Sequence, residues 1–290
     1  MTVEFPVADA RRVVREALIE DLGGLDGIDV TTAATIDPAG RERGHVVARE
    51  AGVIAGLPVI ALVVDEVAGI TRGGTVDVRL LGADGDRVVA GQVMAELDGP
   101  ATTILTAERT LLNIISRLSG VATVTRQWAD ALAGTGTTVL DTRKTTPGLR
   151  ALEKYAVRAG GGTNKRMGLY DVAMIKDNHK LAAGSITAAY ERIRARFPDV
   201  PIQVEVTTVD EAREAVAAGA RFVMCDNMSP ELLGETVAAI RASGESVEIE
   251  ATGGLTLVKA PAYAATGVDY LSVGALTHSA PILDVALDLV

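Results

Sequence analysis

The chain has 290 residues, of which 48% are hydrophobic and 23% are charged. A chain of this size and apolar content can bury a large core, so we expect one large domain or two ordinary ones and no extensive disorder. The formal net charge of −10 and an aromatic content of 3% argue against a nucleic-acid partner, because such binding needs cationic surfaces and aromatic stacking.

We expect no targeting signal in the first twenty residues. They mix acidic, basic and apolar side chains, without the basic segment and apolar core of a signal peptide. The longest apolar run, 53–64, contains Gly56 and Pro58 and is too short to span a bilayer. The only cysteine, Cys225, excludes an internal disulfide, and its apolar neighbours predict a buried strand thiol. We expect a cytoplasmic protein that does not bind membranes.

A first domain is predicted over residues 1–115. It begins with an amphipathic helix that places Ala10, Val13, Val14, Ala17 and Leu18 on one face. Short strands at 44–50, 75–81, 86–90 and 92–99, with a helix near 57–67, predict a compact antiparallel unit. Residues 82–99 resemble the hairpin of biotinyl and lipoyl carrier domains. Residues 1–143 contain no lysine that could be acylated, which excludes that function.

A second domain is predicted over residues 116–290. Two helices, at 106–120 and 121–134, connect the domains, and the last helix is expected to pack back on the first domain. Strands are predicted at 138–142, 172–175, 202–206, 221–225, 247–251 and 269–273. Helices are predicted near 148–159, 185–196, 209–218, 230–242 and 256–265. Six β/α units without a GxGxxG turn favour an α/β barrel, while a doubly wound sheet remains the alternative.

Residues 141–180 form a local island of positive charge. They contain nine Lys or Arg against four Asp or Glu. These cations stand at strand ends and beside glycines rather than in a basic tail. The pattern predicts a polyanionic small-molecule ligand.

Polar residues or glycines stand near the carboxyl end of nearly every predicted strand. In chain order they are Arg143, Lys144, Lys176, Asp177, Glu205, Asp226, Asn227, Thr252, Gly253, Gly254 and Gly274. In a β/α barrel these ends meet at one mouth, where such folds place their active sites.

The strand-end residues differ in the chemistry that they favour. Arg143 and Arg166 suit bidentate carboxylate recognition, whereas Lys144 and Lys176 suit phosphate. Glu205 and Asp226 end neighbouring strands and could hold Mg²⁺ or sugar hydroxyls, with ion pairing to nearby lysines the equally open alternative. The glycine turns at 253–254 and 274 predict a phosphate site.

Other polar residues favour structural roles. Arg150, Lys154 and Arg158 follow an i, i+4, i+8 spacing, which predicts a solvated helix stripe. His45, His179 and His278 are too scattered for a zinc site. We assign His179 a structural hydrogen bond, while His278 could touch a ligand.

The chain resembles the quinolinate phosphoribosyltransferase family nearly end to end. The resemblance rests on EDLGGLDGIDVTT, TAERTLLNIISRLSGVAT, DTRKTTPGLRALEKYAVRAGGG, GLYDVAMIKDNH, EATGGL and GVDYLSVGALTHS. It implies an N-terminal open β-sandwich domain of α+β type, joined to an incomplete α/β (TIM-like) barrel. It also implies a homodimer with shared active sites, in which Arg109 reaches the site of the other subunit.

The resemblance further implies the reaction and its residues. A pentosyl-transferring glycosyltransferase of NAD biosynthesis would use quinolinate, phosphoribosyl pyrophosphate and Mg²⁺ to give nicotinate mononucleotide, pyrophosphate and CO₂. Quinolinate would bind Thr142, Arg143, Lys165, Arg166 and Lys176. Phosphoribosyl pyrophosphate would bind Lys144, Glu205, Asp226, Thr252, Gly253, Gly254, Val273, Gly274 and Ala275. His278 is added as a substrate-binding candidate because it lies near a strand end. Catalysis would rest on Lys144, Lys176, Glu205 and Asp226, with Glu205 and Asp226 on the metal.

Two positions depart from the family pattern. Lys165 stands where relatives usually carry histidine, and Thr252 where serine is common. Threonine keeps the hydroxyl. We expect the Lys165 ammonium to take over a carboxylate contact that the imidazole makes in relatives.

Three alternatives remain open from the sequence. The first is a paralogous transferase for another pyridine or aromatic acid. The second is a barrel lyase that forms a Schiff base at Lys176. The third is a non-catalytic anion sensor, for which the carboxylates of Glu205 and Asp226 would be an unneeded electrostatic cost.

Overall fold

The computed structural model describes residues 4–24 and 26–290, and the chain divides into two compact units. The first unit comprises Met1–Arg126, Thr145–Gly161 and Leu276–Val290. The second comprises Gln127–Lys144 and Gly162–Ala275.

The first unit contains a four-stranded antiparallel sheet. Its order is β12-β1-β5-β3, formed by Val285–Leu289, Arg41–Ala48, Val93–Pro100 and Asp77–Leu80. β12 runs antiparallel to β1, with Gly44 opposite Leu289. The C-terminal segment joins this unit as a strand, because residues 285–289 alternate larger aliphatic side chains with Ala286 and Asp288 at the two-residue period of a strand. A second, two-stranded sheet pairs β2 (Gly52–Val53) with β4 (Arg87–Val88).

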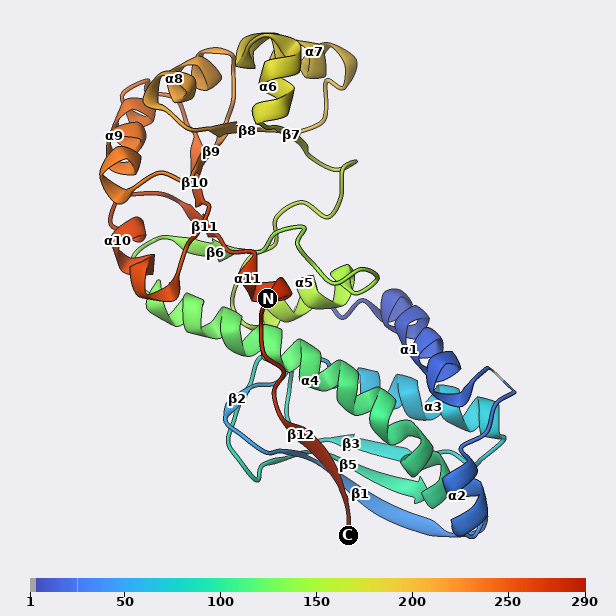
Figure 1. The fold of residues 1–290 in the computed structure, drawn as a ribbon. Coiled ribbons are helices and arrows are strands. Elements are labelled where there is room, and N and C mark those ends of the chain that lie inside the picture. Colours follow the sequence, from blue (N-terminus) through green and yellow to red (C-terminus); the bar gives the residue numbers. More distant parts are fainter. Residues whose placement is uncertain (1–3, 25) are drawn as a thin grey trace. The chain divides into compact units, whose positions relative to one another are not determined.

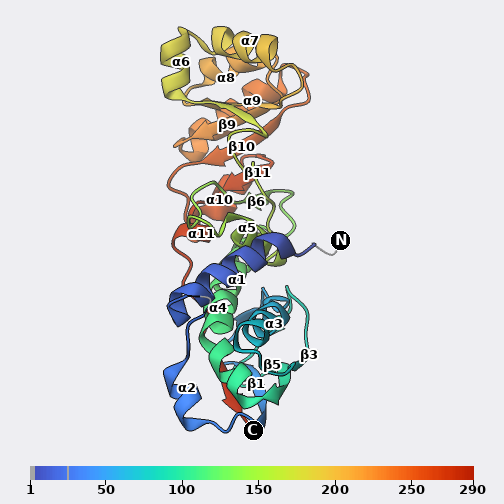
Figure 2. The same cartoon turned by 90° about the vertical axis from the view of Figure 1, so that its right-hand side faces the viewer.

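Helices cover this sheet. α1 (Val7–Leu22) buries four of its five predicted apolar positions, and α3 (Val59–Thr71) confirms the predicted helix near 57–67. The short α2 (Val30–Thr35) begins at Asp29, whose carboxylate accepts the N–H groups of the first turn. In Figure 2, α3 and the first turns of α4 (Ala101–Ala131) lie beside the sheet of this unit.

The long helix α4 corrects the prediction of two helices. It continues for 31 residues through Gly120. A Cβ atom at Gly120 would lie 1.9 Å from the carbonyl oxygen of Pro281, so this glycine permits a close backbone approach instead of ending the helix.

The predicted solvated stripe is also wrong in part. α5 (Arg150–Ala159) forms as expected, and Arg158 is exposed. Lys154, however, is only 2% exposed, and Glu153 is fully buried. The i, i+4 spacing correctly predicted that these residues lie on one helix face, but it did not show that part of this face is buried.

The second unit contains a six-stranded parallel sheet with the order β6-β11-β10-β9-β8-β7. The strands are Thr138–Leu140, Tyr270–Ser272, Glu248–Thr252, Phe222–Asp226, Ile202–Val206 and Ala173–Ile175. Each strand from β7 to β10 pairs with the next in the chain, and β11 pairs with β6. Such a circular order has no reversal point, which excludes the doubly wound sheet. β6 and β7 do not pair with each other among the described residues, so the barrel is incomplete.

Helices follow the strands along one face of this sheet, as Figure 1 shows for α7 to α10. They are α6 (Asp177–Ala183), α7 (Ile186–Arg196), α8 (Val209–Ala217), α9 (Pro230–Arg241), the 3₁₀ turn η1 (Leu257–Lys259) and α10 (Ala260–Ala264), and the helix α11 (Ala275–His278) follows β11. The buried side chains of Val204, Val223 and Ile249 stand in register across three strands. Across residues 4–24 and 26–290, no helix combines the length and apolarity that crossing a membrane requires.

Candidate functional site

The face of the parallel sheet opposite Val204 carries an alternation of acidic and apolar side chains. Glu205, Met224 and Glu250 stand in register on β8, β9 and β10. Residues paired across parallel strands point to the same side of a sheet. Two nearly buried carboxylates and a methionine therefore form one row, which we call the inner row.

Lys165 reaches into the inner row. Its Nζ lies 2.5 Å from Glu250 Oε1 and 3.4 Å from Met224 Sδ, and the lysine side chain is 7% exposed. Asp141 holds the segment, because its Oδ1 accepts the Lys165 backbone N–H at 2.8 Å and its Oδ2 accepts the Asn164 amide at 2.6 Å. The predicted contact of Lys165 with a carboxylate ligand stays a prediction. The structure adds a protein partner that this prediction did not include.

Burial sets the protonation chemistry of Lys165. Desolvation lowers the pKa of its ammonium below the ordinary value, while the Glu250 carboxylate opposes that shift. The nearby Lys176 and Arg166 lower the same pKa further. Lys165 is thus a cation in a cationic neighbourhood, and Glu250 is what favours its charged form.

Lys176 and Glu205 form a second ion pair. Lys176 Nζ lies 2.6 Å from Glu205 Oε2, with the lysine side chain 47% exposed and the carboxylate 8% exposed. The alternative of ion pairing is therefore realised for Glu205. Asp226 differs, because its Oδ2 accepts the side-chain amide of Asn227 at 2.8 Å.

The donor set of Glu205 and Asp226 limits the kind of metal site that could form. Among the residues that the structure describes, no group of three His, Cys, Asp or Glu side chains lies close enough to hold an ion. Mg²⁺ commonly takes one or two carboxylates and completes its shell with phosphate oxygens and water. Two acids on adjacent strands fit such a shared site better than a cage made by the protein alone.

Arg143 and Arg166 lie within Coulombic reach of each other. Burial lowers the pKa of the Arg166 guanidinium, and the positive charge of Arg143 lowers it further. Arg166 Nη1 also donates to the Val172 carbonyl at 2.9 Å. Like charges that a fold holds near one another favour an anion between or beside them. Thr142 and Lys144 adjoin Arg143, and the exposed Lys144 donates its backbone N–H to Thr142 Oγ1 at 3.0 Å.

The turn after β10 requires glycine. Gly253 has a φ of +92°, and a Cβ there would lie 2.3 Å from Asn227 Oδ1. Gly254 has a φ of +58° and open space on its Cβ side. Thr252 joins this turn to the next loop, since its carbonyl accepts the Asn227 N–H at 2.9 Å. Val273, Gly274 and Ala275 follow β11, and Val273 donates to the Leu140 carbonyl of β6 at 2.9 Å.

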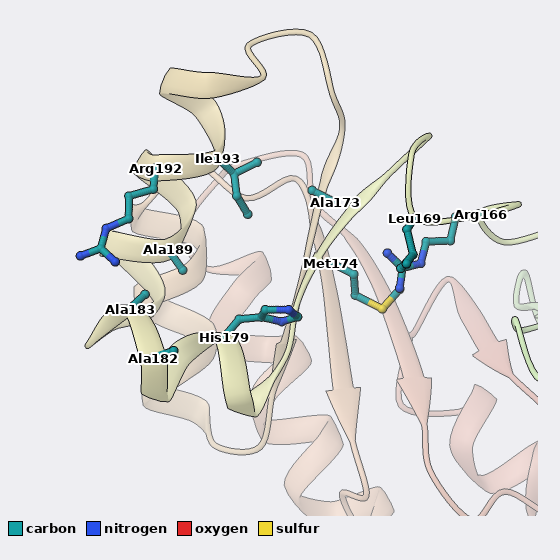
Figure 3. A pocket seen from close by; sticks show the side chains of 10 residues that line it. All are labelled: Arg166, Leu169, Ala173, Met174, His179, Ala182, Ala183, Ala189, Arg192 and Ile193. Carbon is teal, nitrogen blue, oxygen red and sulfur yellow. The ribbon is translucent and has the colours of Figure 1, made fainter.

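A hollow of about 440 Å³ lies at the edge strand β7. Side chains of α6 and α7 line one part of it, and those of Arg166 and Leu169 line another (Figure 3). His179 projects from α6 toward Met174 in this view, and its Nδ1 accepts the Lys176 backbone N–H at 3.0 Å. The structural hydrogen bond predicted for His179 is confirmed.

The second unit brings most of the predicted site residues to the carboxyl edge of its sheet. Arg109 and His278 belong to the first unit. Arg109 is exposed on α4, and His278 is exposed at the end of α11 with Nδ1 2.6 Å from Ser279 Oγ. Cys225 is 1% exposed and burial raises its pKa to about 12, which confirms the inert strand thiol.

Two buried acids near the site were not among the predicted residues. Asp141 and Glu250 are both fully buried. Glu250 interrupts an apolar strand in the same way as Glu205, and Asp141 follows β6 two residues before Arg143. An acid within or at the end of a buried strand is therefore the signal that could have found both.

Comparisons with known proteins agree with this architecture. Residues 29–119 match the model of the quinolinate phosphoribosyl transferase N-terminal domain, and residues 121–288 match that of the C-terminal domain. The chain is 47% identical to the carboxylating nicotinate-nucleotide pyrophosphorylase of Mycobacterium leprae, covering 97% of both chains. It is 37% identical to quinolinate phosphoribosyltransferase [decarboxylating] 1 of Nicotiana glauca, covering 98% of this chain and 83% of that protein. The solved nicotinate-nucleotide pyrophosphorylase of Francisella tularensis superposes with a TM-score of 0.91 at 37% identity, covering 99% of this chain and 98% of that one. The chain belongs to the quinolinate phosphoribosyl transferase family.

Proposed function

We propose that this chain transfers phosphoribose from phosphoribosyl pyrophosphate to quinolinate and removes one carboxylate. The products are nicotinate mononucleotide, pyrophosphate and CO₂, and the role is in NAD biosynthesis. The observation that carries the proposal is the approach of Arg143 and Arg166 beside the inner row, in a chain that is 47% identical to a relative named for this activity.

The acid substrate is proposed to bind through Arg143, Arg166 and Lys176, with the Thr142 hydroxyl beside them. Guanidinium groups match the planar geometry of carboxylates, so two of them can fix both the position and the plane of the pyridine ring. Orientation of the ring nitrogen toward the ribose carbon is the main catalytic demand, since the transfer needs no strong base.

The phosphorylated substrate is proposed to bind at the glycine turns and at Lys144. The backbone around Gly253 and Gly254 suits a terminal phosphate, because left-handed turns present N–H groups without a side chain in the way. Glu205 and Asp226 would hold Mg²⁺, which when bound offsets negative charge on the departing pyrophosphate. Lys176 lies beside one of these two carboxylates, with its Nζ 2.6 Å from Glu205 Oε2.

Loss of CO₂ needs little help from the protein. Breaking the bond between C2 and its carboxylate leaves the electron pair on C2, next to a ring nitrogen that the transfer has made positive. A proton from water then completes the product. The chain's part is to hold the dicarboxylate in place and to limit water around it.

The Schiff-base alternative is not favoured. A lysine that attacks a carbonyl must be neutral, which usually requires desolvation. Lys176 is half exposed and its Nζ lies 2.6 Å from Glu205 Oε2, so it lacks the desolvated setting that Schiff-base chemistry needs.

The experiment that tests the proposed function is a product assay. The purified chain is incubated with quinolinate, phosphoribosyl pyrophosphate and Mg²⁺, and nicotinate mononucleotide is measured by chromatography. We expect product with all three components and none when EDTA replaces Mg²⁺. Absence of product from folded protein would refute the proposed transferase activity. The hypothesis of a non-catalytic anion sensor would then be tested next.

We also propose a homodimer with shared active sites. Large apolar side chains are exposed on and near the segment that links the edge strands β6 and β7, with Leu169 74%, Tyr170 79% and Leu181 83% exposed. Large apolar side chains exposed to this extent favour a protein partner over water. Arg109 is exposed on α4 and, as the resemblance implies, would enter the site of the other subunit.

Mixing of inactive variants tests the shared site. Arg109→Ala and Lys144→Ala should each abolish most activity, and a reassorted mixture should regain part of it, because one of two sites in each heterodimer is intact. Heterodimers that form without regaining activity would place Arg109 in the site of its own subunit. The cytoplasmic location expected from the sequence stays a prediction.

A further inference from the structure

Cations outnumber the buried carboxylates of the inner row. Arg143, Lys165, Arg166 and Lys176 supply four cations, while Glu205 and Glu250 supply two carboxylates. Lys165 pairs with Glu250 and Lys176 with Glu205. Arg143 lies within Coulombic reach of Arg166, and so does the carboxylate of Asp171. Quinolinate carries two negative charges.

The charge balance at this face depends on whether the Glu250 carboxylate is neutralised. The side chain of Glu250 is fully buried, and among the described residues its Oε2 has no hydrogen-bond partner. A buried carboxylate acts over a longer range than an exposed one, because water does not screen it. Without Lys165, this charge would oppose the entry of any dianion at the same face of the sheet.

Lys165 is poorly placed to pair with Glu250 and to contact a ligand at the same time. Its ammonium is 2.5 Å from Glu250 Oε1 and 3.4 Å from Met224 Sδ, with only 7% of the side chain exposed. Asp141 Oδ1 accepts the Lys165 backbone N–H at 2.8 Å and so fixes its backbone. To reach a ligand, the ammonium would have to leave a buried carboxylate without its counter-charge.

We propose that Lys165 is a positioning residue for acid binding: it neutralises Glu250, so that the field of Arg143 and Arg166 is left for the dicarboxylate, and it does not itself contact the substrate. This inference rests on the proposed function and replaces the expected direct contact of Lys165 with the acid. The proposal predicts that quinolinate binding no longer requires Lys165 when the charge of Glu250 is also removed.

A double-mutant cycle of Lys165→Met, Glu250→Gln and the double variant tests the proposal. Quinolinate affinity is measured by calorimetric titration of each folded protein. Lys165→Met should weaken binding by at least about tenfold, and the double variant should bind within about threefold of the parent, because coupled charges give non-additive effects. Glu250→Gln alone should bind no more weakly than the parent. If Lys165→Met does not fold, the parent and the double variant decide the question.

A charge effect differs from a structural one in its dependence on ligand charge. Lys165→Met should lose more affinity for quinolinate than for nicotinate, which has one carboxylate, whereas a distorted site would lose both equally. Lys180→Met is a matched control. Its Nζ pairs with Glu211 at 2.9 Å and the side chain is 11% exposed, but the pair joins α6 to α8. Quinolinate affinity should not change in this variant.

Two results would overturn the inference. One is a double variant that binds quinolinate as weakly as Lys165→Met, or more than about threefold more weakly than the parent, since a direct ligand is not replaced by removal of Glu250. The other is an equal loss for quinolinate and nicotinate. A parent chain that does not bind quinolinate would instead refute the proposed function, so the two failures are distinguishable.

Discussion

Substitution of Glu153 by glutamine should destabilise the first unit far more than its small change in shape suggests. Glu153 is fully buried, and its Oε1 accepts from Arg117 Nε at 3.0 Å, from Arg117 Nη2 at 2.8 Å and from Thr146 Oγ1 at 2.8 Å. Its Oε2 accepts the Thr146 backbone N–H at 3.0 Å. One glutamine side chain cannot accept at both positions, because its amide nitrogen would face a donor.

The magnitude follows from the bonds that are lost. Glutamine keeps the acceptor for Arg117 but removes its negative charge, and it turns the bond to the Thr146 N–H into a contact between two donors. Arg117 retains the carbonyl oxygens of Thr277 and Ala280, which limits the loss. We expect the free energy of unfolding to fall by about 2–4 kcal/mol, less than complete removal of a buried ion-pair partner.

Urea unfolding followed by circular dichroism measures this difference. Asp210→Asn is the control, because Asp210 also pairs with an arginine but is 91% exposed, so its loss should change stability by less than about 0.5 kcal/mol. If Glu153→Gln matched the control, the buried network would contribute nothing measurable and the reasoning from burial would be refuted.

Three further substitutions have defined outcomes. Gly120→Ala should lower the free energy of unfolding by roughly 1–3 kcal/mol despite the better helix propensity of alanine, because the new Cβ meets the Pro281 carbonyl, and a stabilised variant in urea unfolding would contradict this. Gly253→Ala should raise the KM for phosphoribosyl pyrophosphate more than that for quinolinate, since it strains the turn against Asn227; steady-state kinetics with equal rises would contradict it. Hydrogen bonds, first from the Thr32 side chain, lower the pKa of Asp29 below 3.8, so its charged form stabilises the fold above that pH and the benefit is lost as the pH falls through the lower folded-state value. Unfolding measured from pH 5 downward should show a steeper loss for the parent than for Asp29→Asn, and parallel curves would exclude this role.

The fold was predictable where local pattern and burial agree. The strand at 202–206 is found at the predicted residues, because a short apolar run between turns favours a buried strand. Gly120 misled the prediction, since a glycine that ends a helix and one that admits a neighbouring backbone look alike in sequence. Lys154 also misled the prediction, because the sequence of a charged helix face does not show whether another element covers it.

The site was predictable in its cations but not in their partners. Basic residues at strand ends are visible in the sequence, and parallel strands bring their ends to one edge. The partner of Lys165, however, is Glu250, which lies 85 positions away in the chain. Pairing at that separation depends on strand register, which the sequence pattern left undefined. The positive charge of the site was thus predictable, whereas the pairing of each cation with its carboxylate required the structure.

The specificity for quinolinate over nicotinate tests the central claim most directly. With phosphoribosyl pyrophosphate and Mg²⁺ in excess, kcat/KM is measured for both acids, and CO₂ is counted against nicotinate mononucleotide. A site with two guanidinium groups near each other should prefer the dicarboxylate by at least about a hundredfold, because a monocarboxylate can engage only one of them. It should also release one CO₂ for each nucleotide formed. Comparable kcat/KM values for the two acids, or nucleotide formed from quinolinate without CO₂, would contradict the proposed function.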